Sequence, residues 1–281
     1  MQIDQTTVHA AALPIAAGRP VGETTAGEAA PLRNEPVHLV AANDTAAGAD
    51  DPRTQALLAQ DVYNDVAIPP PGYRVAGEDD LRALNLDPSL LTDGSFRARV
   101  YVTGEGAAAE YSIAFRGSQS AQDWLTNAQQ GLGFDSVHYR AALAIGERVA
   151  RSDIADQVRF TGHSLGGGLA SAAAIAAGRP ADTFNAAGLH QDTIDEAQAK
   201  RQAAGAPTAA QVDSWQVQGE ILALMQDGGD RLLVSPFLDL PASYGTRHVL
   251  DAVAPEGAGF FDQFNPLARH GIDWVLSSLP H

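Results

Sequence analysis

Gly162–Gly167, with the sequence GHSLGG, is the stretch that decides the fold. It has the G-x-S-x-G pattern of a nucleophile elbow, a sharp turn from a strand into a helix that presents a serine side chain. Gly162 and Gly166 stand two positions before and two after the serine, where such a turn leaves little room for a side chain. The pattern therefore predicts that Ser164 is a catalytic nucleophile.

The residues on both sides of this stretch agree with an elbow. Residues 157–161 (QVRFT) predict a short strand, and residues 165–177 predict a helix built almost entirely of small residues. Gly178 and Pro180 then end the helix. A chance G-x-S-x-G is the alternative in a chain with 27 glycines. The strand before the serine and the helix after it favour the elbow.

The remainder of the chain alternates between strand and helix patterns. Strands are predicted at residues 96–103, 109–116, 182–185 and 212–217, and helices at residues 54–65, 136–151, 193–203 and 269–279. Such alternation predicts an α/β fold with a mainly parallel sheet covered by helices on both faces. We assign residues 51–281 to one α/β-hydrolase domain and residues 1–50 to a flexible or loosely packed N-terminal arm.

Composition excludes several classes of function. The net charge of −16 argues against nucleic acid as a partner and against electrostatic docking on anionic lipid. No apolar run reaches the roughly 20 residues of a membrane-spanning helix, and the first residues lack the pattern of a secretory signal. Both the bacterial cytoplasm and secretion by a signal-independent route remain open. No metal or organic cofactor is expected, since the chain has no cysteine and no calcium-loop spacing.

A serine nucleophile needs a base, and in α/β-hydrolases that histidine follows the serine in the chain. His190 comes before any plausible acid, and His281 is the last residue. His270 is the preferred base because it stands where a loop enters the predicted last helix. His248 is the rival, although its surroundings are typical of a strand.

The acid that orients the base should follow a strand between the serine and the histidine. Glu220 stands directly after the strand at 212–217 and a glycine, so it is the preferred acid, and Asp227 is the alternative. Asp230 and Asp239 are weaker candidates, because an acidic residue in so acidic a chain is most often solvated surface.

The oxyanion hole requires two hydrogen-bond donors. One is expected from the backbone N–H of Leu165, the residue after the nucleophile, and the other from the loop after an upstream strand. Phe115-Arg116-Gly117-Ser118 supplies that loop, in which Ser118 carries both an N–H and an O–H donor.

Phe115-Arg116-Gly117-Ser118, the Trp124 that follows it and the GHSLGG elbow together resemble the lipase class 3 family, over roughly residues 54–279. The family includes triacylglycerol lipases and phospholipases A1. The resemblance implies that Ser118 donates to the oxyanion and that His270 precedes a closing helix. Glu220 departs from the aspartate usual in the family. Bacterial members without a signal look like phospholipase effectors, which implies an inhibitor, immunity or secretion partner.

The resemblance also implies a short lid helix after Ser118, with Trp124 facing the acyl groove. Periodicity agrees, because between residues 121 and 134 the apolar side chains fall on one helical face: Trp124, Leu125, Ala128 and Leu132. An ordinary surface helix that packs this face on the core is the alternative.

These observations predict a serine hydrolase of lipid esters, a phospholipase A1 or a lipase, that touches the membrane surface transiently. A soluble carboxylesterase or thioesterase with the same triad is one alternative. A catalytically silent hydrolase fold that acts as a binding module is another. Preference for vesicles over dissolved short-chain esters separates the first two.

Overall fold

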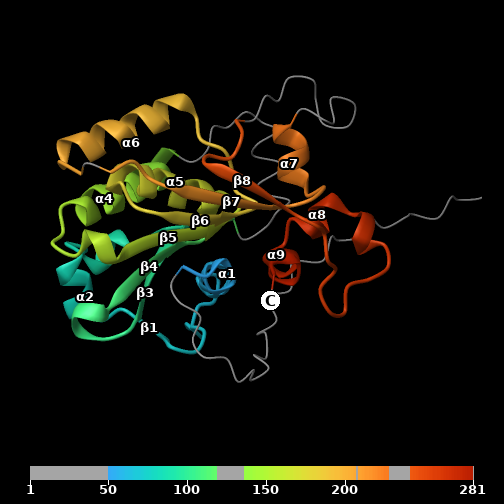
Figure 1. Cartoon of the computed structure of the whole chain (residues 1–281), viewed down its shortest axis with the longest axis horizontal. Helices are drawn as coiled ribbons and strands as arrows, with labels where there is room; N and C mark the ends of the chain where they lie inside the picture. Colours follow the sequence, from blue (N-terminus) through green and yellow to red (C-terminus); the bar gives the residue numbers. More distant parts are fainter. Residues whose placement is uncertain (1–49, 119–135, 207, 228–240, 281) are drawn as a thin grey trace, which may run out of the picture. The chain divides into compact units, whose positions relative to one another are not determined.

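The computed structural model describes residues 50–118, 136–206, 208–227 and 241–280. Its centre is a sheet with the strand order β1-β3-β4-β5-β6-β7-β8, to which the short β2 is added beside β3 (Figure 1). Pairing is antiparallel from β1 through β3 to β4 and parallel from β4 through to β8. The predicted mainly parallel sheet is confirmed.

The strands and helices have the following bounds. The strands are β1 (Tyr73–Val75), β2 (Thr92–Asp93), β3 (Phe96–Thr103), β4 (Glu110–Phe115), β5 (Val158–His163), β6 (Ala181–Phe184), β7 (Val212–Val217) and β8 (Thr246–Leu250). The helices are α1 (Pro52–Asp61), α2 (Glu78–Ala83), α4 (Ser136–Ala150), α5 (Leu165–Ala177), α6 (Gln191–Ala203), α7 (Ile221–Gln226), α8 (Pro266–Arg269) and α9 (Ile272–Ser278). The single helix expected at 269–279 is wrong, because His270 and Gly271 separate α8 from α9.

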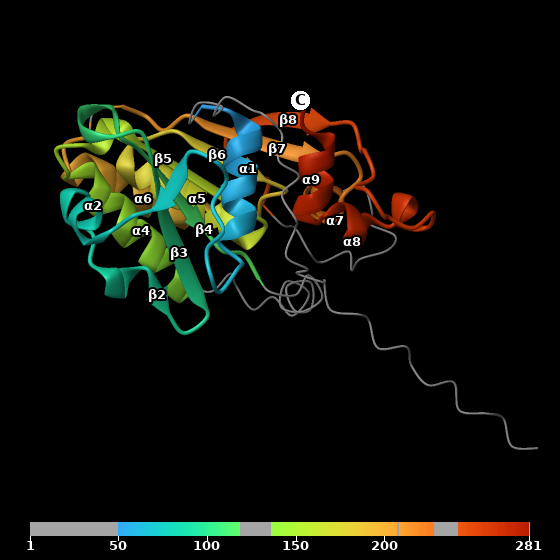
Figure 2. The same cartoon turned by 90° about the horizontal axis from the view of Figure 1, so that it is seen from below.

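Helices cover both faces of the sheet, as predicted. The neighbouring helices α4, α5 and α6 lie on one face, and the neighbouring helices α1 and α9 lie on the other (Figures 1 and 2). The main hydrophobic core fills the first interface, and a smaller cluster that includes Trp274 and Val275 of α9 fills the second. The sheet is therefore held rigidly at its centre, where β5 delivers the elbow.

Helix α5 explains why the residues after the elbow are so small. All of its residues from Leu165 to Ala177 are buried. A Cβ atom added to Gly146 of α4 would lie only 3.0 Å from the Cα of Ala173 in α5, so the two helices are in backbone contact there. Small side chains let α5 sit deep against the sheet, which fixes the position of its N-terminus and of Ser164.

Two further expectations concern the ends of the chain and the membrane. None of the described helices has the length and apolar character needed to span a bilayer. The predicted arm, residues 1–50, lies outside the described residues except for Asp50, so it stays a prediction.

Candidate active site

Ser164 stands at the turn between β5 and α5, in the backbone geometry of an elbow. Its φ of 60° and ψ of −127° are uncommon for a residue with a side chain. A Cβ on Gly162 would collide with the carbonyl of Gly166, and a Cβ on Gly166 would collide with the carbonyl of Phe115. The carbonyl of Ser164 accepts from the N–H groups of Gly167 and Ala187, both at 3.0 Å. The turn is therefore closely supported, and both glycines of the motif are needed for it.

Ser164, His270 and Glu220 form a continuous hydrogen-bonded chain. His270 Nε2 lies 2.9 Å from Ser164 Oγ, and His270 Nδ1 lies 2.7 Å from Glu220 Oε2. All three residues are buried. Because a carboxylate only accepts, Nδ1 carries the proton and Nε2 is left to accept the proton of the serine hydroxyl. The structure thus brings together the nucleophile, base and acid that the sequence selected.

Glu220 is fixed in place by the start of the next helix. Its carboxylate accepts from the backbone N–H of Leu222 at 2.9 Å and from that of Ala223. These hydrogen bonds make Glu220 the N-cap of α7 and fix the orientation of its carboxylate. The alternative acid, Asp227, is instead paired through both of its oxygens with Arg247, at 2.6 and 2.8 Å. Glu220 and not Asp227 faces the imidazole.

The rival base His248 lies elsewhere on the sheet. Its Nε2 is 2.7 Å from Asp213 Oδ1, and its ring stacks on Trp215 with centroids 4.2 Å apart. Asp213 is near the beginning of β7, whereas Glu220 follows the end of that strand. His248 therefore belongs to a different cluster from Ser164.

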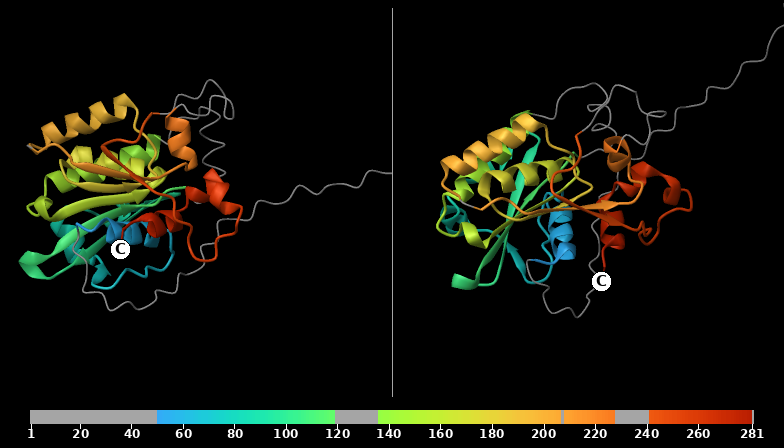
Figure 3. Two further views of the ribbon diagram at one scale, coloured as in Figure 1. Left: turned by 45° about the vertical axis from the view of Figure 1, so that its right-hand side comes forward. Right: turned by 45° about the horizontal axis from the view of Figure 1, so that its top comes forward.

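The backbone that carries His270 is fixed by two polar side chains that the sequence analysis did not select. Asn185, after β6, donates from its amide to the carbonyls of Arg269 at 3.2 Å and His270 at 3.1 Å. Arg269 donates to the carbonyl of Gln218 at 2.9 Å, which ties the base segment to the acid segment. Figure 3 shows α7 and α8 together near the carboxyl end of β7. A polar residue directly after a core strand, such as Asn185, is the signal that was available.

His163 and Tyr63 form a second polar chain behind the nucleophile. His163 Nε2 lies 2.7 Å from the carbonyl oxygen of His270, and its Nδ1 lies 3.3 Å from the Tyr63 hydroxyl. Burial, reinforced by the neighbouring His270, lowers the pKa of His163 to about 3. A neutral His163 donates from Nε2 to that carbonyl and accepts from Tyr63 at Nδ1. His163 thus positions the base segment from a site beside Ser164.

The segment predicted to stabilise the oxyanion runs beside the nucleophile. A Cβ on Gly117 would lie 3.3 Å from the Cβ of Ser164, and the N–H of Gly117 donates to Tyr63 Oη at 3.0 Å. Ser118 follows directly and is half-buried. Leu165 is the first residue of α5, so its N–H has no acceptor within the helix. Gly117, which precedes Ser118, and Leu165 therefore both lie beside Ser164.

The predicted lid and the question of a metal site remain to be placed against the structure. Trp124 and Leu125, the predicted lid residues, fall within 119–135 and stay predictions. Among the residues for which the structure gives positions, no group of three or more His, Asp or Glu side chains is placed to hold a metal ion.

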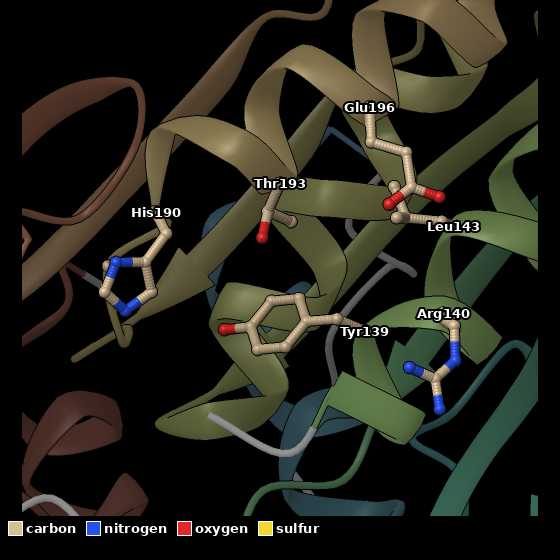
Figure 4. Close-up of a pocket in the computed structure, with 7 residues that line it drawn as sticks. Tyr139, Arg140, Leu143, His190, Thr193 and Glu196 are labelled. Carbon is tan, nitrogen blue, oxygen red and sulfur yellow. The ribbon is translucent and has the colours of Figure 1, made fainter. Parts of the chain in front are cut away.

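A cavity of about 180 Å³ lies between α4 and α6, apart from the triad (Figure 4). Its lining residues are Tyr139, Arg140, Leu143, Gly188, His190, Thr193 and Glu196. His190, already excluded as the base, lies here. None of Ser164, His270 and Glu220 lines the cavity, so it is separate from the hydrogen-bonded chain.

A buried Ser–His–Glu chain on a strand–turn–helix elbow, set in a mainly parallel sheet, defines a serine hydrolase of the α/β-hydrolase fold. Residues 54–259 match the model of the Tle-like phospholipase domain. Over 238 residues, which are 80% of this chain and 69% of its relative, the sequence is 32% identical to the extracellular phospholipase A1 of Serratia liquefaciens. The chain belongs to the Tle-like phospholipase family and is a lipid carboxylic-ester hydrolase.

Solved structures of esterases overlap more distantly. A thermostable carboxylesterase cloned from a metagenomic library is 14% identical, with 82% of this chain and 96% of the other covered and a TM-score of 0.32. A hyperthermophilic esterase from the archaeon Pyrobaculum calidifontis is 16% identical, with 81% and 90% covered and a TM-score of 0.27. The fold of this chain is defined by its own strand order and by the elbow.

Proposed function

We propose that the protein is a phospholipase of A1 type, which releases the acyl chain from the sn-1 position of a membrane phospholipid. The observation that carries the proposal is the hydrogen-bonded Ser164–His270–Glu220 chain, in a sequence 32% identical to a phospholipase A1. The FRGS and GHSLGG motifs, which resemble those of class 3 lipases, support the same plan of catalysis.

The reaction follows from the direction of the hydrogen bonds. Ser164 Oγ attacks the acyl carbonyl carbon while its proton passes to His270 Nε2, 2.9 Å away. The imidazolium that forms is stabilised by Glu220, which accepts from Nδ1 at 2.7 Å. The developing oxyanion is held by the N–H of Leu165 and by Ser118. His270 then returns the proton to the oxygen of the departing lysophospholipid, and water releases the acyl chain from Ser164 by the same steps.

The roles of Trp124 and Leu125 are proposed from the sequence alone. They follow the oxyanion segment, and their apolar face suits a lid over the acyl groove. If they have this role, Trp124→Asp lowers turnover of vesicle phospholipid far more than turnover of a dissolved short-chain ester. Trp124→Ala, which removes the ring without adding charge, is the matched control.

Product analysis tests the proposal. Vesicles of a phospholipid that carries different acyl chains at its two positions are incubated with the native protein and with Ser164→Ala, and the products are identified by mass spectrometry. We expect the sn-1 fatty acid and the 2-acyl lysophospholipid from the native protein alone. Release of the sn-2 chain would contradict the A1 assignment. Cleavage of dissolved esters only would favour a soluble carboxylesterase.

A further inference from the structure

Three phenylalanines lie exposed and together in the segment between β8 and α8. Phe260, Phe261 and Phe264 are 68%, 82% and 70% exposed. The ring centroid of Phe260 is 5.6 Å from that of Phe261 and 5.8 Å from that of Phe264. Soluble proteins seldom leave a contiguous cluster of aromatic rings in water, because each ring carries a large apolar area. We call these three residues the phenylalanine cluster.

The backbone that carries the phenylalanine cluster is held by local hydrogen bonds. The N–H of Gly259 donates to the Asp262 carboxylate at 2.8 Å, and the N–H of Phe264 donates to the carbonyl of Phe261 at 3.1 Å. Asp262–Phe264 forms a short 3₁₀ helix, after which Asn265 caps α8. The rings are therefore presented by a structured turn, which reduces the ordering cost when they meet a partner.

Arg269 links this turn to the segments that carry His270 and Glu220. The guanidinium of Arg269 donates to the carbonyl of Gln263, inside the turn, and at 2.9 Å to the carbonyl of Gln218. Arg269 precedes His270, and Gln218 stands two residues before Glu220. In Figures 1 and 2 the red segment between β8 and α8 projects from the body of the molecule on the side of α8. A partner surface that binds the phenylalanine cluster would therefore lie beside the segment that carries His270.

Charge restricts the nature of that surface. The chain carries a net charge of −16, and in the sequence Glu256 precedes the cluster and Asp262 stands between Phe261 and Phe264. Anionic lipid therefore offers no electrostatic attraction, and a membrane contact has to come from apolar side chains. Aromatic side chains at the headgroup level are a usual means of interfacial binding.

We infer that Phe260, Phe261 and Phe264 insert into the interfacial region of a phospholipid bilayer and hold the Ser164–His270–Glu220 site at its surface. This inference rests on the proposed phospholipase function, and it names the physical form of the substrate as lipid within a bilayer of low charge. Docking is apolar, so it tolerates high salt and is at least as strong on phosphatidylcholine vesicles as on anionic ones.

Vesicle binding tests the inference without requiring catalysis. Ser164→Ala protein is floated with phosphatidylcholine vesicles, alone and with the three phenylalanines changed to serine (F260S, F261S and F264S together). We expect the serine triple variant to lose partitioning by a factor on the order of 100. The corresponding leucine triple variant keeps most of the binding, because it preserves apolar side chains. Val75→Ser, which changes an exposed apolar residue on the edge strand β1, is the control for a general surface effect.

Activity gives a second readout in the Ser164 background. The serine triple variant should lose far more turnover on phosphatidylcholine vesicles than on a short-chain phosphatidylcholine dissolved below its micelle concentration. Equal partitioning of the parent and the serine variant would overturn the inference. The inference would also be overturned if light scattering showed that the parent protein self-associates through these rings, while the serine variant is monomeric and still binds vesicles. If the native protein cleaves no phospholipid in either form, the proposed function fails, and flotation still decides the membrane contact.

Discussion

Two histidine–carboxylate pairs stand near opposite ends of β7, and they have the same contact distance. His270 lies 2.7 Å from Glu220, and His248 lies 2.7 Å from Asp213. The side chains of the first pair are 4% and 0% exposed, whereas those of the second are 35% and 25% exposed. Water screens the second pair and leaves the first in a low-dielectric site. The distance alone therefore does not tell the pair beside Ser164 from the pair near the start of β7.

The orientation of the ring and the end of the strand distinguish the two pairs. His270 turns Nδ1 to its acid and leaves Nε2 for Ser164, while His248 uses Nε2 for Asp213 and stacks on Trp215. The carboxyl ends of parallel strands share one edge of the sheet, which is where β5 ends at the elbow. Glu220 follows that end of β7, and Asp213 is near the other end. A base in this fold is identified by the edge it shares with the nucleophile.

The largest expected effect comes from breaking the buried pair and its nucleophile. Ser164→Ala and His270→Ala should each lower kcat by about 10⁶-fold, because members of a triad act as a unit. His248→Ala, the matched change in the other pair, should leave kcat close to native. Initial rates on phospholipid vesicles give the comparison, and fluorophosphonate labelling should map to Ser164. If His248→Ala abolishes turnover and His270→Ala does not, the assignment of the base is wrong.

The acids sharpen the same comparison. Glu220→Gln keeps the shape of the side chain but removes the charge that orients and stabilises the imidazolium, so kcat should fall by about 10⁴-fold. Asp213→Asn, in the half-buried His248 pair, and Asp227→Asn, in the Arg247 pair, should have little effect on turnover. Steady-state kinetics at constant pH measure all three. A severe Asp227→Asn and a mild Glu220→Gln would transfer the role of the acid to Asp227.

How far the sequence predicted the site depended on the distance over which its residues interact. The elbow was readable because Gly162, Ser164 and Gly166 act within one turn. Glu220 and His270 were readable from chain order and from their places after a strand and before a helix. The supporting contacts of Asn185 and Arg269 were not readable, because they join carbonyls far apart in the chain, and no local pattern encodes which carbonyl a side chain will reach.

The same reasoning explains the two features of the fold that the sequence misplaced or missed. The apolar periodicity across 269–279 continues through His270 and Gly271, so it predicted one helix. In the structure the carbonyl of His270 accepts from the side chains of Asn185 and His163 and not from an N–H of a helix. The phenylalanine cluster was overlooked because periodicity describes buried faces, and these rings are exposed.

Changing Tyr63 tests whether turnover depends on the support that its hydroxyl gives to the segment predicted to stabilise the oxyanion. Tyr63→Phe removes the hydroxyl that accepts from the N–H of Gly117 and leaves that donor without its partner. An unpaired buried donor costs about 1–3 kcal/mol. Because Gly117 precedes Ser118, part of this cost should appear as a fall in kcat on the order of tenfold, with KM little changed. Tyr73→Phe, on the edge strand β1, is the control, and equal kinetics for both variants would remove Tyr63 from the oxyanion support.

The last expected effect is on stability and not on turnover, and it concerns His163, which contacts the carbonyl of His270 yet stays neutral. Burial and the neighbouring His270 lower its pKa from 6.5 to about 3. Between pH 6.5 and pH 3 the unfolded chain therefore binds a proton at His163, whereas the folded protein does not. The stability that the neutral ring contributes is thus fully present above pH 6.5 and is lost as the pH falls toward 3. Between pH 7 and pH 5 the loss is about 2 kcal/mol.

His163→Gln keeps an N–H donor for the carbonyl of His270 but does not titrate, so its free energy of unfolding should fall by about 2 kcal/mol less over the same interval. Denaturant unfolding of both proteins at the two pH values measures this difference. Equal losses would mean that the folded protein takes up a proton at His163 by pH 5, and Nδ1 of the ring would then donate to the Tyr63 hydroxyl instead of accepting from it.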